Sequence, residues 1–245
     1  MQPRSRYVLI GLVTLVLGLI VLFPARVGYQ WFAPPGVALS GIDGTIWSGS
    51  ARDGDVAGLY VRGLQWRMRP LALFKGQLAF AIEADTGSGF LEGNVGLGAG
   101  GAVAMTDLTA AMTLESIQEM VGMPGLSGML NARFERLTVE NGIPVAAAGT
   151  LEIADLRAPL IDRGPIGGYR AEFFTQESGV MASVEDTDGV VDLAGSLQLS
   201  PDSSYQFIAQ LAPKGNTPAK LREQMKFLGT PNERGQYEMR LEGEL

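Results

Sequence analysis

From Val37 to the end of the chain, apolar side chains recur at every second position, and this spacing decides most of what the chain can form. In the first clear segment, Leu64, Trp66 and Met68 alternate with polar neighbours. Residues two apart share one face of a strand, so the pattern predicts half-buried strands with one apolar face each. Comparable segments lie at 78–83, 130–134, 169–173, 191–199, 205–211 and 237–241.

Short turn signals separate these segments. Asp-Gly pairs occur at 43–44, 53–54 and 188–189, and an Asn-Gly pair at 141–142. Such pairs tolerate the positive φ angles of tight hairpins, so consecutive strands are expected to pair antiparallel. The fold predicted is mainly β: a long, curved antiparallel sheet that forms a β-roll or an open groove. The pattern does not decide whether the sheet closes on itself.

Two short helices interrupt the strand pattern. The first is predicted near 116–124, where Ser116 and Glu119 have the spacing of a capping box. The second is predicted over 217–228, with Thr217 as its cap and Pro218 in its first turn. Both are interpreted as structural plugs on the sheet, and a partner-binding helix is the alternative.

The first 26 residues differ from the rest. Tyr7 to Phe23 carries no charge, Arg4 and Arg6 precede it, and Arg26 follows. At 1.5 Å per residue the run spans about 26 Å, close to a bilayer core of about 30 Å. Residues 1–26 are therefore predicted to form a cytoplasmic start and a single transmembrane helix, and residues 27–245 a periplasmic β-rich domain.

The positive-inside rule places the amino terminus in the cytoplasm and the bulk of the chain across the bacterial inner membrane. One alternative is a cleaved signal peptide, but the stretch LFPARVG offers no good cleavage site. The other is a buried core helix, which the strand-rich remainder is not expected to enclose. The uncleaved anchor is therefore the preferred interpretation.

The amino-acid composition limits which catalytic, metal-binding and partner-binding functions the chain can have. The chain has no histidine and no cysteine, so it lacks the residues of Ser/His/Asp and Cys/His pairs, the usual zinc ligands and disulfides. Beyond residue 26 it carries 16 basic against 26 acidic residues, a net charge of −10, which disfavours nucleic acid as a partner. No cofactor, metal or catalytic activity is expected, although two carboxylates that meet only in the folded chain are not excluded by sequence.

Two motifs suggest ligands but fit turns better. GLGAGG at 96–101 matches the dinucleotide fingerprint, yet no helical pattern follows it. RDGD and EDTDG place carboxylates near turns, but the second lacks the first acid and the final glutamate of a calcium loop. A loop and two turns are predicted instead.

Four stretches together resemble one family. They are PPGVALSGIDGTIWSGSA, LQWRMRPLALFKGQLAFAIE, LAGSLQLSPDSSYQFIAQLAPK and LREQMKFLGTPNERGQYEMRLEGEL. They are similar to the type II secretion system protein N family of the general secretion pathway, although Met68 stands where leucine is usual. The resemblance implies an inner-membrane component with a periplasmic domain that assists export of folded proteins across the outer membrane, with other secretion subunits as partners and no catalytic residue. More distantly, the chain resembles AsmA-like envelope proteins, which implies an apolar groove for lipid.

The candidate residues follow from these two hypotheses. A secretion subunit would bind other envelope components through strand edges or its anchor, whereas a lipid- or amphiphile-binding protein would use an apolar groove. The two tryptophans are expected to stack in or beside such a groove. The structural or groove residues predicted are Trp47, Trp66, Leu78, Phe80, Tyr205 and Phe207. On the opposite face, Arg67 and Arg69 are either solvated or contact lipid headgroups or an acidic partner.

Overall fold

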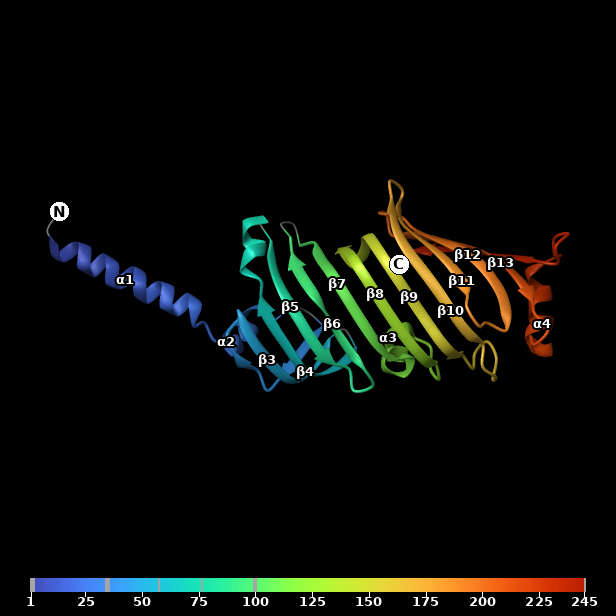
Figure 1. The fold of residues 1–245 in the computed structure, drawn as a ribbon, viewed down its shortest axis with the longest axis horizontal. Helices are drawn as coiled ribbons and strands as arrows, with labels where there is room; N and C mark the ends of the chain where they lie inside the picture. Colours follow the sequence, from blue (N-terminus) through green and yellow to red (C-terminus); the bar gives the residue numbers. More distant parts are fainter. Residues whose placement is uncertain (1–2, 34–35, 57, 76, 99–100, 245) are drawn as a thin grey trace.

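A computed structural model describes residues 3–33, 36–56, 58–75, 77–98 and 101–244. It contains one antiparallel sheet of fourteen strands, which runs along the long axis of the molecule (Figure 1). The mainly β fold class predicted from the alternation is therefore confirmed. The strands are β1 (Val37–Ser40), β2 (Asp43–Gly44), β3 (Ser48–Val56), β4 (Leu59–Met68), β5 (Leu78–Asp85), β6 (Phe90–Leu97), β7 (Val103–Thr113), β8 (Ser127–Glu140), β9 (Ile143–Arg157), β10 (Gly167–Gln176), β11 (Gly179–Asp186), β12 (Val191–Leu199), β13 (Ser204–Pro213) and β14 (Tyr237–Glu244).

The order of the strands in the sheet is almost the order in the chain. From β3 to β14 each strand pairs with its successor, and β1 and β2 both pair with β3. Every pairing is antiparallel, as the turn signals predicted. Within the described residues β1 and β14 each have a neighbour on one side only, so the sheet is open.

The turn signals at 141–142 and 188–189 lie between strands as predicted, but the pairs at 43–44 and 53–54 lie in β2 and β3. Asn141 and Gly142 have φ angles of 52° and 86° and join β8 to β9 as a tight hairpin. Asp53 and Gly54 instead lie inside β3, opposite β4. A Cβ at Gly54 would lie 2.5 Å from Leu39 Cδ2, so this glycine serves close packing of β1 rather than a turn.

Both predicted short helices are present, but neither is capped as expected. The first is the 3-10 turn η2 (Leu114–Ile117) followed by α3 (Gln118–Val121), and the second is α4 (Ala219–Met225) followed by η3 (Lys226–Leu228). No side chain caps either α-helix. The Ser116 hydroxyl lies 2.7 Å from that of Ser88, and Thr217 bonds elsewhere, because each hydroxyl finds a tertiary partner.

The amino-terminal segment forms two helices, α1 (Pro3–Val21) and α2 (Ala25–Phe32), and a further 3-10 turn, η1 (Pro70–Lys75), follows β4. In Figure 1, α1 extends beyond the end of the sheet and α4 lies at the opposite end. Over the described residues, no helix combines the length and the apolar character needed to cross a membrane. The division at residue 26 remains a prediction.

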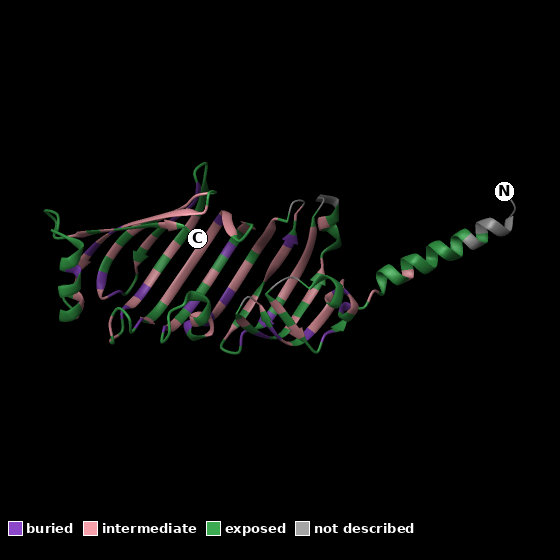
Figure 2. Cartoon of the chain, turned by 180° about the vertical axis from the view of Figure 1, so that it is seen from behind, coloured by how far each residue is buried: buried purple, intermediate pink, exposed green. Residues whose placement is uncertain are grey.

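The apolar core is small and divided. The chain exposes 15380 Å², whereas a compact monomer of its 26.0 kDa mass exposes about 10,500 Å². Figure 2 shows buried residues as short patches between longer half-buried and exposed stretches of the strands. Hydrophobic burial is therefore limited, and the antiparallel ladder must contribute much of the order.

One glycine shows how closely the strands approach. A Cβ at Gly149 in β9 would lie 2.3 Å from the Arg133 carbonyl oxygen and 2.6 Å from Phe134 Cα. We expect Gly149→Ala to lower the free energy of unfolding by about 1–3 kcal/mol, because the neighbouring strand would have to move. Urea unfolding followed by tryptophan fluorescence measures this change.

The matched control is Gly96→Ala in β6, where the nearest atom to the added Cβ is the Ala104 carbonyl oxygen at 3.6 Å. This variant should keep or slightly raise the stability, because alanine is favoured over glycine in a strand. Equal effects of the two substitutions would contradict the packing account.

Candidate functional site

One face of the sheet is apolar from β4 to β14. The strand registers join successive cross-strand neighbours into a row that starts in β4 and ends in β14. At the bulge of β7 opposite Gly93, a Cβ on Gly93 would lie 3.0 Å from Leu108 Cα, which continues the row into β7. Its members are Trp66, Ile82, Gly93, Leu108, Phe134, Gly149, Phe173, Ala182, Leu197, Phe207 and Leu241.

The predicted groove residues share this face but lie in two places. In β5, Phe80 lies opposite Met68 of β4 and Val95 of β6. Leu78 and Phe80 are four and two residues from Ile82 of the row, so all three side chains lie on the same face. Tyr205 is two residues from Phe207 in β13. Eight steps of the sheet separate β5 from β13, a distance of about 38 Å at about 4.8 Å per step.

The two tryptophans are held by main-chain hydrogen bonds rather than by each other. Trp47 Nε1 donates to the Ile20 carbonyl oxygen at 2.7 Å, and Trp66 Nε1 donates to that of Thr45 at 3.2 Å. Trp66 also packs against a small buried cluster formed by Ala25 of α2, Ile42 and Ala51. The ring pairs found among the described residues are formed by other side chains, so the expected stacking is not seen.

The two predicted contact arginines lie on the polar face. Arg67 is opposite Ser48 and Ala81, and its side chain is exposed. Arg69 borders a surface hollow of about 460 Å³ that extends over β5 to β7. Within the described part of the chain neither arginine forms an ion pair, so their proposed partners stay a prediction.

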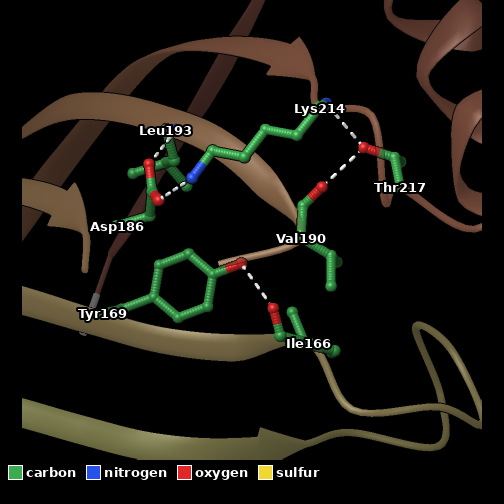
Figure 3. A network of polar contacts seen from close by, with 7 residues as sticks. All are labelled: Ile166, Tyr169, Asp186, Val190, Leu193, Lys214 and Thr217. Carbon is green, nitrogen blue, oxygen red and sulfur yellow. Dashed lines mark hydrogen bonds and ion pairs between the residues drawn. The ribbon is translucent and has the colours of Figure 1, made fainter. Parts of the chain in front are cut away.

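A polar network that sequence reasoning missed lies where β10 to β13 meet the segment before α4 (Figure 3). The Asp186 carboxylate accepts hydrogen bonds from Lys214 Nζ and, at 2.8 Å, from the Leu193 N–H. Its side chain is only 7% exposed. The Thr217 hydroxyl donates to the Val190 carbonyl oxygen at 2.5 Å and accepts from the Lys214 N–H at 2.7 Å.

Two groups in and beside this network, the Asp186 carboxyl and the Tyr169 phenol, have shifted pKa values. Burial alone would raise the pKa of Asp186, but the hydrogen bonds from Lys214 and Leu193, with the Lys214 charge, hold that pKa below its usual range. Burial, with the nearby Asp186 charge, raises the pKa of Tyr169 to about 12. Neither group exchanges protons near neutral pH, so the network is suited to holding strands rather than to acid–base catalysis.

Local sequence gave little sign of this network. Asp186 was interpreted as part of a turn, and Lys214 lies 28 residues further along the chain. The pair meets only because β11, β12 and β13 are successive strands of one sheet. In the described residues, no group of three or more acidic side chains is arranged to hold a metal ion.

These features define a class: a single-layer antiparallel β protein with one continuous apolar face and an open edge. A sequence model of the family described as "Type II secretion system (T2SS), protein N" matches residues 35–240. The match covers β1 to β13 and half of β14, and the chain belongs to this family. The resemblance to the type II secretion system protein N family is thereby confirmed.

Two relatives carry the same description. The chain is 29% identical over 254 residues to "Type II secretion system protein N" of Vibrio cholerae serotype O1, covering 100% of both chains. It is 26% identical over 220 residues to the protein of that name from Aeromonas hydrophila, covering 86% of each. No solved structure matches the chain significantly.

The polar network makes a pH-dependent contribution to stability. Because the pKa of Asp186 is lower in the folded chain, its contribution is present above the unfolded pKa and is lost as the pH falls through the folded pKa. We expect Asp186→Asn to lower the free energy of unfolding at pH 7 by about 1–3 kcal/mol and to flatten the acid limb of the pH profile. Urea unfolding at a series of pH values measures both effects.

The control is Glu152→Gln, which breaks an exposed ion pair with Arg170 and should cost less than about 1 kcal/mol. At alkaline pH the Tyr169 contribution is present below its unfolded pKa and is lost as the pH rises towards about 12. Tyr169→Phe should therefore flatten the alkaline limb alone. An acid limb that is the same in wild type and Asp186→Asn would contradict the assignment.

Proposed function

We propose that this protein is an inner-membrane-anchored, periplasmic component of the type II secretion pathway, which assists export of folded proteins by binding other secretion subunits. The observation that carries the proposal is the family match over residues 35–240, which covers nearly the whole sheet. The sheet architecture supports a binding role, since a long antiparallel sheet with a free edge can pair with a strand of another protein.

The anchor is supported by the amino-terminal segment. Tyr7 to Phe23 is uncharged, and Arg4 and Arg6 outnumber Arg26 across it, which favours a cytoplasmic amino terminus. The large apolar side chains along α1 are mostly exposed in the isolated chain, and Leu15 is 60% exposed. We propose residues 1–26 as the cytoplasmic start and anchor and residues 27–245 as the periplasmic domain, where Trp47 connects the sheet to Ile20 of α1.

A second function is favoured by one observation, the continuous apolar row from Trp66 to Leu241. Most of its large members are only half buried, so the face retains apolar surface that a lipid chain or another amphiphile can cover. In this proposal the predicted groove residues Leu78, Phe80, Tyr205 and Phe207 contact the ligand. This second proposal corresponds to the apolar lipid groove that the distant AsmA-like resemblance implies.

The secretion role predicts a defect that depends on α1. In a strain that lacks the gene, exported proteins should accumulate in the periplasm, and the wild-type chain should restore their release. Leu12→Arg combined with Leu15→Arg should abolish both rescue and membrane retention, because two charges on α1 oppose insertion. Alkaline phosphatase fused after residue 245 reports the location of the domain and should be active.

The matched control is Leu71→Arg with Leu73→Arg, which adds the same charges to two exposed leucines of η1. That variant should still rescue secretion. Normal release of exported proteins in the deletion strain would overturn the secretion role, whereas an inactive phosphatase fusion would overturn only the proposed topology.

The lipid-binding role predicts a difference between two phenylalanines. Phe207→Ser should reduce the lipid that co-purifies with the full chain, because it removes apolar surface from the row. Phe174→Ser, on the opposite face of β10 and 39% exposed, should not. Mass spectrometry of extracted lipid, with lipid around α1 common to both variants, measures the difference, and equal lipid content would contradict this role.

A further inference from the structure

The two ends of the sheet differ in how their outer edges are protected. At the first end, β1 is only four residues long, and α2 lies beside it. The Tyr29 hydroxyl donates to the Val37 carbonyl oxygen and accepts from the Leu39 N–H, each at 2.9 Å. One side chain thus takes the place of a neighbouring strand and blocks strand addition there.

The other end is longer and uncovered. The eight residues of β14 pair with β13 in unbroken register, and within the described residues nothing pairs with the outer side of β14. Alternate residues of an edge strand direct their N–H and C=O groups outward, so β14 presents a row of backbone donors and acceptors that can pair with another strand. Leu241, the last member of the apolar row, is 51% exposed, and Phe227 of the adjacent η3 is 91% exposed.

The charge on the polar face of β14 favours an added strand of opposite charge. Its side chains are Glu238, Arg240, Glu242 and Glu244, three carboxylates and one guanidinium, for a net charge of −2. Arg240 lies 3.6 Å from Glu238 and 4.0 Å from Glu242, so it is already shared between two of the acids. A strand added here would place its own polar side chains against this acidic surface.

A second copy of the chain is a poor occupant. Two β14 strands paired antiparallel with their apolar faces together bring six carboxylates and two guanidinium groups onto one surface. The paired strands then carry a net charge of −4 from these side chains, and like charges gathered on one face of neighbouring strands repel one another. The acidic edge therefore disfavours self-association and favours a partner of opposite charge.

We propose that β14 is the docking edge of the protein and that it takes an extended segment of another protein, in which apolar residues alternate with lysine or arginine. The apolar residues extend the row beyond Leu241, and the basic residues face Glu242 and Glu244. This inference rests on the proposed function and deepens it, because it names the edge used and the chemistry of the partner.

The test uses the full chain in a non-ionic detergent and three fluorescent eight-residue peptides. One alternates valine or leucine with lysine or arginine, the second has the same composition in separate apolar and basic blocks, and the third replaces the basic residues with glutamate. Anisotropy should show the alternating basic peptide binding at least tenfold more tightly than the others. Glu242→Lys with Glu244→Lys should weaken that binding at least tenfold and strengthen binding of the acidic peptide.

The control variant is Glu172→Lys with Glu185→Lys, which makes the same charge change at exposed polar-face positions of β10 and β11. It should change the affinity less than twofold. A photoreactive group on the alternating peptide should label residues 237–244, and amide exchange there should slow on binding. Two exposed positions are changed in each variant, so both should unfold like the wild type.

The inference would be overturned by equal binding of the alternating and block peptides, by no effect of the β14 variant, or by labelling elsewhere on the chain. Concentration-dependent dimers abolished by the β14 variant would also overturn it, since a second copy would then be the occupant. These results leave the secretion role standing if deletion of the gene still blocks release, so the two proposals fail separately.

Discussion

The antiparallel hydrogen-bond ladder that joins each strand to the next is the interaction on which the rest of this protein depends. A sheet one layer thick has no second layer to enclose its apolar face, and the large exposed area of the chain reflects this. What burial there is comes from small clusters, each held by a local element: α2 at one end, η2 near the middle and α4 at the far end. The hydrogen-bond ladder joins these separate clusters into one continuous sheet.

The polar network of Asp186, Lys214 and Thr217 strengthens the ladder beside the apolar cluster at the far end of the sheet. It ties the segment before α4 to β11 and β12 and lets Met225 of α4 pack against Val191 and Leu211. A buried carboxylate is costly unless it is paired and hydrogen-bonded, and here both conditions are met. The network thus supports the far end of the sheet, on which the open strand β14 lies.

The single-layer sheet also connects the structure to its proposed roles. An uncovered apolar face and an uncovered edge are features that a self-sufficient globular domain would bury or block. Tyr29 blocks one edge of the sheet, whereas β14 at the other edge has no further strand beside it among the described residues. The two ends of the sheet therefore differ: the amino-terminal end is joined to α1, and the carboxyl-terminal end is the docking edge that we propose. Membership of the type II secretion system protein N family is consistent with a chain built to bind within a larger assembly.

Much of the fold could be predicted because it is a local property. The period of two in segments such as 64–69 and 205–211, and the Asn141–Gly142 turn, predict strands and hairpins directly, since each depends on neighbours in the chain. The errors arose where a distant partner intervened. Thr217 was expected to cap a helix but bonds to Val190, and Asp53–Gly54 was expected to turn but lies inside β3, where Leu39 needs the space.

By itself, the sequence determined the strand period, the antiparallel pairing, the apolar face and the family, because these follow from residue order and from motifs that are continuous in the chain. Only the tertiary structure decided that the sheet stays open, that Tyr29 covers one edge, and that Asp186 meets Lys214. Each of those depends on the register and curvature of the whole sheet, which bring together residues that no spacing in the sequence relates.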